Sequence, residues 1–171
     1  MISLSRASGS HADDGNPTTL PEGWLGPGQN FLGLEEPWCD PARAGVYILP
    51  APYEHTSSYV PGSDHGPSAI LEASQQVELY DETLGFETYR EWGGVATKVP
   101  LELNGKVDKD AVDAIHAYVR PHVKTDRLVV TLTGEHTGAL GAIRAHARTY
   151  PDLCVVQVDR RIKAIPSAMP A

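Results

Sequence analysis

The hydrophobic residues of this chain alternate between short apolar runs and positions at helical spacing. Apolar runs bounded by turn-forming residues predict strands at Val46–Leu49, Leu128–Leu132 and Leu153–Val158. The glycine-containing run Gly94–Thr97 indicates one further short strand within the less regular segment Phe86–Leu103. With the helices between them, the expected order is strand, helix, strand, helix, strand, helix, strand.

Three helices are predicted between these strands. The first opens at Gly66-Pro67, because proline is tolerated at the first helical position, and continues toward Tyr80. The second begins at Asp108 as an N-cap and is closed by Pro121, and the third ends before Tyr150. Their buried faces are formed by apolar residues at helical spacing: Ile70, Leu71 and Val77, then Val112, Ile115 and Val119, then Ala139, Leu140, Ile143 and Ala147.

The last two predicted strands and the helix between them form one crossover unit. Strands joined in this way lie parallel, and the crossover is right-handed in nearly all proteins. Ligands of such open sheets gather beyond the carboxyl ends of the strands. His136 follows the strand at Leu128–Leu132, and Asp159 directly follows the strand at Leu153–Val158. The sequence therefore predicts half of a metal site at this edge.

The chain divides into three segments by composition. Residues 1–30 are rich in Ser, Gly, Pro and Asp and predict a flexible leader, because they bury too little apolar surface to offset the entropy of ordering. Residues 31–159 contain the predicted strands and helices and form the α/β domain. Residues 160–171 have no strand or helix pattern and are expected to be a tail.

Composition supports one globular domain and excludes several partners. Of the 171 residues, 41% are hydrophobic and 21% are charged, which is enough for one buried core. A formal net charge of -8 gives no basic surface for nucleic acid or an anionic membrane. Cys39 and Cys154 lack a Cys-x-x-Cys spacing and are expected to be reduced thiols. Since the sequence has neither a transmembrane stretch nor a signal-peptide pattern, a cytoplasmic location is expected.

Several short motifs together resemble the ureohydrolases, the arginase and agmatinase family, with the agmatinase branch as the nearest likeness. They are Pro52-Tyr53-Glu54, Thr56–Tyr59, Pro61-Gly62, Gly66-Pro67 and Gly134–Thr137. The last looks like the first metal motif of the family, two glycines, an acidic residue and a ligand histidine, with Thr133 in place of the first glycine. The likeness extends from about Phe31 to Asp159.

The resemblance implies a three-layer α/β/α fold with a mainly parallel, arginase-like sheet and two Mn²⁺ ions at its carboxyl edge. His136 and Asp159 would each bind a metal, and carboxylates with imidazoles suit manganese better than thiolates do. In such enzymes the two metals share a hydroxide that attacks the guanidinium carbon. The implied substrate is agmatine, hydrolysed to putrescine and urea, although arginine and guanidinobutyrate remain open. The family also implies a homo-oligomer.

The sequence departs from the family directly after Asp159. The second metal motif should read Asp-x-His-x-Asp, but Arg161 stands at the histidine position and Lys163 at the second aspartate position. Cationic side chains cannot donate lone pairs to a metal and repel one that approaches. The later Asp-x-Asp motif and the carboxylate that receives the guanidinium are missing. We therefore expect an inactive chain that cannot assemble the dinuclear centre, as a shifted reading frame or a truncated gene would produce.

Other interpretations remain open. His136 alone is also typical of a helix-capping or surface residue, and Asp159 of a turn former or an N-cap. Alternative functions are a non-catalytic interaction or regulatory relative and a small α/β module that binds an anion at Thr133–Gly138. A third possibility is an incomplete chain without a stable fold. The remaining histidines of the expected domain are predicted to be loop, surface or partly packed residues: His55, His65, His116, His122 and His146.

Overall fold

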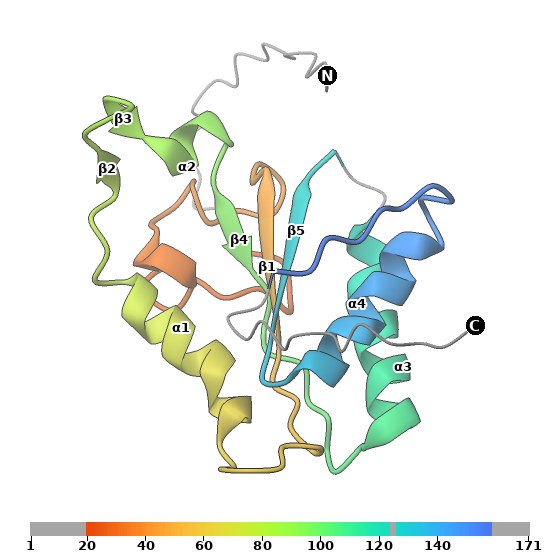
Figure 1. The fold of residues 1–171 in the computed structure, drawn as a ribbon. Coiled ribbons are helices and arrows are strands. Elements are labelled where there is room, and N and C mark those ends of the chain that lie inside the picture. Colours follow the sequence, from red (N-terminus) through yellow and green to blue (C-terminus); the bar gives the residue numbers. More distant parts are fainter. Residues whose placement is uncertain (1–19, 124–125, 159–171) are drawn as a thin grey trace, which may run out of the picture.

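Three parallel strands form the main sheet of this protein. The computed structural model describes residues 20–123 and 126–158. Within these ranges the strands lie in the order β4-β1-β5, with β1 at Val46–Ala51, β4 at Val95–Thr97 and β5 at Leu128–Thr133 (Figure 1). Both pairings of β1 are parallel, and its register with β5 runs along the full length of the two strands. The predicted strands at these three places are confirmed.

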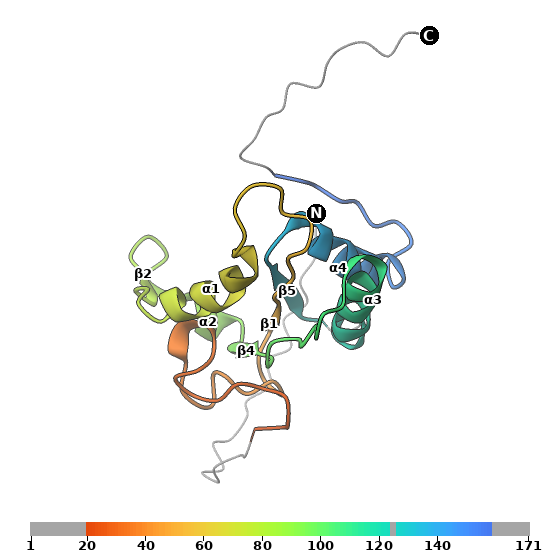
Figure 2. The ribbon, with the colours of Figure 1, turned by 90° about the horizontal axis from the view of Figure 1, so that it is seen from below.

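Helices cover both faces of this sheet. Helix α1 (Gly66–Ser74) lies on one face, and α3 (Asp108–Val119) and α4 (His136–Ala147) lie together on the other (Figure 2). The expected three-layer α/β/α fold with a parallel sheet is therefore confirmed. The described parts of the chain also contain three short 3₁₀ helices, at Phe31–Gly33, Ser63–His65 and Arg120–His122.

Strand β1 is buried on both of its faces, because each face meets a different helical layer. Tyr47 and Leu49 point into the core formed with α3 and α4, in which Ile115 is fully buried. Ile48, on the opposite face, packs in a second core with Leu71 of α1. Successive side chains of a strand alternate between its faces, so a continuous apolar run is what a central parallel strand requires.

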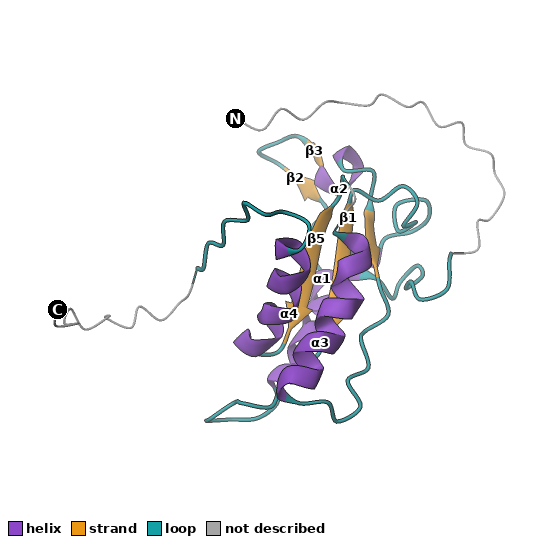
Figure 3. Ribbon diagram, turned by 90° about the vertical axis from the view of Figure 1, so that its right-hand side faces the viewer, coloured by secondary structure: helices purple, strands orange, loops and turns teal. Residues whose placement is uncertain are grey.

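Helices α3 and α4 approach each other closely at Gly141. They lie side by side on one face of the sheet (Figure 3). A Cβ atom at Gly141 would be 2.7 Å from Cβ of Ile115 and 2.8 Å from the carbonyl oxygen of Val112. The absence of a side chain at Gly141 thus allows the two backbones to meet at this distance.

A small hairpin and a shorter first helix differ from the sequence prediction. Helix α1 ends at Ser74 and does not continue toward Tyr80. The Ser74 hydroxyl donates to the carbonyl of Leu71, 2.7 Å away, and accepts from the N–H of Leu32, which ties the helix end to the preceding part of the chain. The chain then forms the antiparallel pair β2 (Tyr80–Asp81) and β3 (Phe86–Glu87), followed by the short helix α2 (Thr88–Glu91).

The expectation of a flexible leader was wrong for residues 20–30. Trp24 forms a β-bridge with Lys98, and its ring centroid lies 4.7 Å from that of Tyr47. Asn30 is fully buried. Composition underestimated this segment because one tryptophan and one hydrogen-bonded amide contribute contacts that a count of aliphatic residues omits. Residues 1–19 of the predicted leader lie outside the described residues.

The strand predicted at Leu153–Val158 is not formed. These residues lack strand pairing, and Val156 and Val158 are 81% and 93% exposed. An apolar run predicts extended backbone, but a strand also requires a neighbouring backbone with which to exchange hydrogen bonds. The predicted crossover unit therefore stops after α4 in the described part of the chain. The predicted tail and Asp159 lie outside the described residues.

Candidate functional site

The carboxyl ends of β1 and β5 form one rim of the domain. Ala51, the last residue of β1, pairs in register with Thr133, the last residue of β5. The segment after β1 runs through Tyr53 to the start of α1, and the segment after β5 contains only Gly134 and Glu135 before α4 begins. Because both strands end at the same level, these two segments meet at the edge where open α/β sheets bind ligands.

Gly134 allows the two segments to pack backbone against backbone. A Cβ atom at this position would lie 2.6 Å from the carbonyl oxygens of both Tyr53 and Ser63. No side chain fits there without displacement of the main chain. Glycine in the motif that precedes His136 is thus explained by a close approach rather than by a positive backbone angle.

The carboxylate of Glu135 binds the segment that follows β1. Its Oε2 atom accepts hydrogen bonds from the backbone N–H groups of His55 and Thr56, at 3.1 and 2.9 Å. Its Oε1 atom accepts one from the Thr56 hydroxyl at 2.8 Å. Burial by itself raises the pKa of Glu135, but the hydrogen bonds from Thr56 and His55 outweigh burial and lower the pKa below its ordinary value. The carboxylate form is therefore favoured.

A second carboxylate closes the long loop of this rim. Glu54 Oε2 accepts a hydrogen bond of 2.6 Å from the backbone N–H of Gly62. This hydrogen bond is the main reason why the pKa of Glu54 lies below its ordinary value. Between these two residues the loop exposes Tyr59, which is 94% accessible. The loop is thus fixed at its two ends and open to solvent at its tip.

His136 lies at the same rim as the first residue of α4. Its side chain is exposed, at the carboxyl end of β5. This is the place that the sequence predicted for the first candidate ligand. Asp159, the second candidate, lies outside the described residues, and the strand that was expected to bring it to the rim is not formed. The juxtaposition of His136 with Asp159 stays a prediction.

The described residues do not by themselves fit a manganese site. No group of three or more His, Cys, Asp or Glu side chains in residues 20–123 and 126–158 is arranged to hold a metal ion. Glu135, the carboxylate next to His136 in sequence, is engaged with the segment that follows β1. His136 therefore offers one donor, whereas a bound divalent ion takes several.

The other histidines are distributed over the whole domain. His55 belongs to the rim, and its Nε2 atom lies 3.9 Å from Oδ1 of Asp108 at the start of α3. The sequence predicted a surface or partly packed histidine here, yet the position of His55 shortly after β1 was a signal for the same edge of the sheet. His122 instead packs edge-on against Trp24 and Tyr47, where burial, and to a smaller extent Lys98, lower its pKa. It is partly packed, as predicted.

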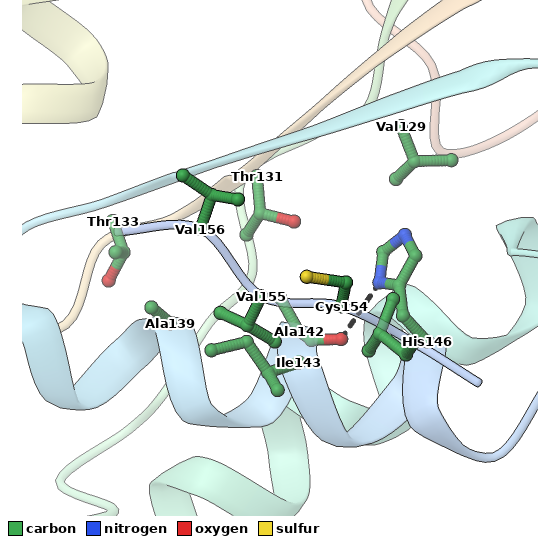
Figure 4. Close-up of a pocket in the computed structure, with 11 residues that line it drawn as sticks. Val129, Thr131, Thr133, Ala139, Ala142, Ile143, His146, Cys154, Val155 and Val156 are labelled. Atoms are coloured by element: carbon green, nitrogen blue, oxygen red, sulfur yellow. Dashed lines mark hydrogen bonds between the residues drawn. The ribbon is translucent and has the colours of Figure 1, made fainter. Parts of the chain in front are cut away.

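An apolar pocket of about 340 Å³ lies between β5, α4 and the segment after α4 (Figure 4). His146 is one of the lining residues, and its ring nitrogen Nδ1 lies 2.9 Å from the carbonyl oxygen of Ala142. The other lining residues are the aliphatic Val129, Ala139, Ala142, Ile143, Leu153, Val155 and Val156, together with Thr131, Thr133 and Cys154. The pocket thus lacks the carboxylates of a metal site.

None of the helices in the described residues is long and apolar enough to cross a membrane.

Comparison with known proteins connects this rim to one family. The sequence matches the Arginase family over residues 44–160. It is 42% identical to N(1)-aminopropylagmatine ureohydrolase from Synechocystis sp., over 69% of this chain and 40% of that protein. It is 32% identical to the agmatinase of Bacillus cereus, over 67% of this chain and 39% of that protein.

A solved structure gives the same assignment. The agmatine ureohydrolase of Thermoplasma volcanium superposes with a TM-score of 0.51 at 26% identity, covering 60% of this chain and 34% of that one. The chain thus spans about 40% of the length of the curated relatives that it matches. Since the match to the family covers most of the chain and includes both strands of the rim, the chain belongs to the arginase family.

Proposed function

We propose that this chain is the N-terminal portion of an agmatinase-like ureohydrolase, which hydrolyses a guanidine compound in a manganese-dependent reaction. Agmatine, converted to putrescine and urea, is the proposed substrate. The observation that carries the proposal is the position of His136, which lies at the carboxyl end of β5 within the motif Gly134–Thr137. Relatives named agmatinase and N(1)-aminopropylagmatine ureohydrolase support the substrate class.

His136 and Asp159 are the proposed metal-ligand positions of this chain. His136 would provide an imidazole from the first turn of α4, and Asp159 a carboxylate that lies outside the described residues. Because the described residues do not make a complete site, we assign no step of the reaction to them. We further propose that the substrate is a small guanidine compound, that the protein is cytoplasmic and that it assembles into a homo-oligomer.

The 171-residue polypeptide is proposed to be inactive by itself. Arg161 and Lys163 stand where the family motif Asp-x-His-x-Asp has its histidine and its second aspartate. These two cationic residues, within four positions of Asp159 in sequence, weaken the binding of a metal ion there, because like charges repel. This feature also favours the second candidate function, a non-catalytic relative that retains the fold as an interaction or regulatory subunit.

Anion binding at the start of α4 is the less favoured alternative. Backbone N–H groups at a helix N-terminus attract anions. Here the carboxylate of Glu135 precedes the helix and carries a negative charge at that position. The measurement that would support the alternative is phosphate affinity in the absence of any manganese binding.

Manganese content and urea release test the proposal. The purified chain is loaded with Mn²⁺, desalted and assayed by elemental analysis, and urea release is measured with agmatine. We expect less than one Mn²⁺ per chain and no turnover. Stoichiometric manganese together with urea release would show that the chain is active and that the proposed inactivity is wrong.

Restoring the second metal motif of the family tests the two proposed ligand positions. The double variant R161H/K163D gives the chain the family sequence Asp-x-His-x-Asp after Val158. If His136 and Asp159 are ligand positions, this variant should bind Mn²⁺ more tightly than the natural sequence, and adding H136A should remove the gain. The matched control H116A, which changes a histidine of α3, should leave the gain intact. No gain in R161H/K163D would contradict the ligand assignment.

A further inference from the structure

The Glu135 side chain accepts its hydrogen bonds from the segment after β1, across the rim, and not from its own helix α4. It occupies the N-cap position of α4, with extended backbone angles, but its side chain makes no capping hydrogen bond to that helix. Both carboxylate oxygens instead accept hydrogen bonds from His55 and Thr56, which lie about eighty residues earlier in the sequence. Ser, Thr, Asp and Asn are the residues that ordinarily cap a helix with their own side-chain oxygen. The longer side chain of Glu135 instead reaches the segment after β1.

Thr56 connects the same carboxylate to the first turn of α4. Its hydroxyl donates to Glu135 Oε1 at 2.8 Å and lies 3.3 Å from the hydroxyl of Thr137. The backbone N–H of Thr56 donates to Glu135 Oε2 at 2.9 Å. Thr56 therefore contacts the residues on either side of His136. Hydrogen bonds to an ionised group are stronger than those between neutral groups, so this network restrains the backbone at His136 from both directions.

Close packing at two glycines, one on either side of His136, also restricts the backbone there. Gly134 packs against the carbonyl oxygens of Tyr53 and Ser63, at a distance that would exclude a Cβ atom. Gly138, in the first turn of α4, lies so close to the side chain of Thr133 that a Cβ atom would overlap its hydroxyl. His136 is thus held between two positions at which the backbone is closely packed.

We propose that Glu135 is a positioning residue that fixes the imidazole of His136 at the rim by tying the first turn of α4 to the segment after β1. This inference rests on the proposed ligand role of His136. The positioning acts through Thr56, which accounts for two of the three hydrogen bonds to the carboxylate. A residue that binds a metal has to be held in a narrow range of orientations, and its neighbours in contact provide that restraint.

The variant T56V in the full chain tests this inference without changing any charge or any residue next to His136. Valine has the shape of threonine but lacks the hydroxyl that bonds Glu135 and faces Thr137. The control T56S keeps the hydroxyl. The side-chain resonances of His136 are followed by NMR in the absence of metal and substrate, and amide hydrogen exchange is followed at His55 and Thr56.

We expect T56V to shift or broaden the His136 side-chain resonances, whereas T56S leaves them close to those of the natural sequence. Amide exchange at Thr56 should accelerate about tenfold or more in E135Q, because a charge-assisted hydrogen bond is weakened. In the double variant E135Q/T56V, the His136 resonances should resemble those of E135Q alone, since both changes break one network.

Two results would overturn the positioning role. If T56V speeds amide exchange at His55 and Thr56 but leaves the His136 resonances unchanged, Glu135 stabilises only the loop after β1. If neither the exchange rates nor the resonances change, the network has no effect on either segment. Because the experiment uses neither manganese nor agmatine, its failure is distinguishable from failure of the proposed ureohydrolase function. Thermal unfolding of each variant shows whether a shift reflects local rearrangement or loss of the fold.

Discussion

Gly134 lies so close to Ser63 that a Cβ atom on Gly134 would be 2.6 Å from the Ser63 carbonyl oxygen. The atoms that such a side chain would meet belong to the main chain and cannot rotate away. G134A should therefore destabilise the domain by about 1–3 kcal/mol, as overpacked substitutions do. Urea unfolding followed by circular dichroism measures the difference.

The matched control for this substitution is G66A. Gly66 opens α1 with a φ of -53°, and apart from its chain neighbours and the nearby backbone of its own helix no atom lies within 4 Å of the position that its Cβ would occupy. Alanine there should stabilise the chain by a few tenths to about 1 kcal/mol, through a less flexible unfolded state. Equal effects of the two variants would contradict the close approach at Gly134.

Replacement of Asn30 tests whether the segment before residue 31 belongs to the domain. The Asn30 side chain accepts from the N–H of Leu34 at 2.7 Å and donates to the Leu34 and Gly26 carbonyls at 2.8 and 2.9 Å. N30A leaves the N–H and the carbonyl of Leu34 without these partners in a buried position, at a cost of about 1–3 kcal/mol each. Q29A, at the exposed neighbouring residue, should change the unfolding free energy by less than about 0.5 kcal/mol. If N30A leaves the unfolding free energy unchanged, residues 20–30 do not contribute to the stability of the domain, as the flexible-leader prediction had it.

The loop between Glu54 and Gly62 should open on acidification. The Gly62 N–H lowers the pKa of Glu54 in the folded chain, so the unfolded chain binds the proton more tightly. The stabilisation from this bond is fully present above the ordinary glutamate pKa and is lost as the pH falls through the lower folded value. The Gly62 amide resonance should shift with a midpoint below pH 4.5, the ordinary value of the carboxyl group. E54Q should abolish the shift, and a midpoint above pH 4.5 would contradict the bond.

Substitution of Gly141 should separate α3 from α4. A Cβ atom there meets the side chain of Ile115 at 2.7 Å and the Val112 carbonyl oxygen at 2.8 Å. Ile115 is fully buried, so the helices have to move apart, and G141A should cost about 1–3 kcal/mol. Unfolding in urea measures the loss, and a variant as stable as the natural sequence would show that the helices adjust freely.

Apolar patterns predicted the central elements well because burial constrains them on every side. The run at Val46–Leu49 is apolar at consecutive positions since β1 meets helices on both faces. The spacing of Val112, Ile115 and Val119 identified the buried face of α3 for the same reason. Local motifs likewise placed His136 at the end of β5, because the side chain follows its strand directly in sequence.

Pairing between distant segments was less predictable. The segment Leu153–Val158 is as apolar as β5 but has no strand partner, while Tyr80–Asp81 pairs with Phe86–Glu87 across a turn that contains Gly85. Hydrogen-bonded neighbours decide whether an extended segment becomes a strand, and their positions depend on the whole fold. The same limit applies to Asp159, whose expected position depended on that segment.

The sequence by itself determined the α/β class, the central strands and the identity of the candidate ligand His136, because periodicity and local motifs act over a few neighbouring residues. Only the tertiary structure decided that Trp24 packs on Tyr47 and that Glu135 binds Thr56 across the rim. These contacts join residues that are far apart in the chain, and their energies depend on distances that the folded backbone sets. Glu135 adjoins His136 in sequence, but its pairing with Thr56 depends on proximity in the folded chain.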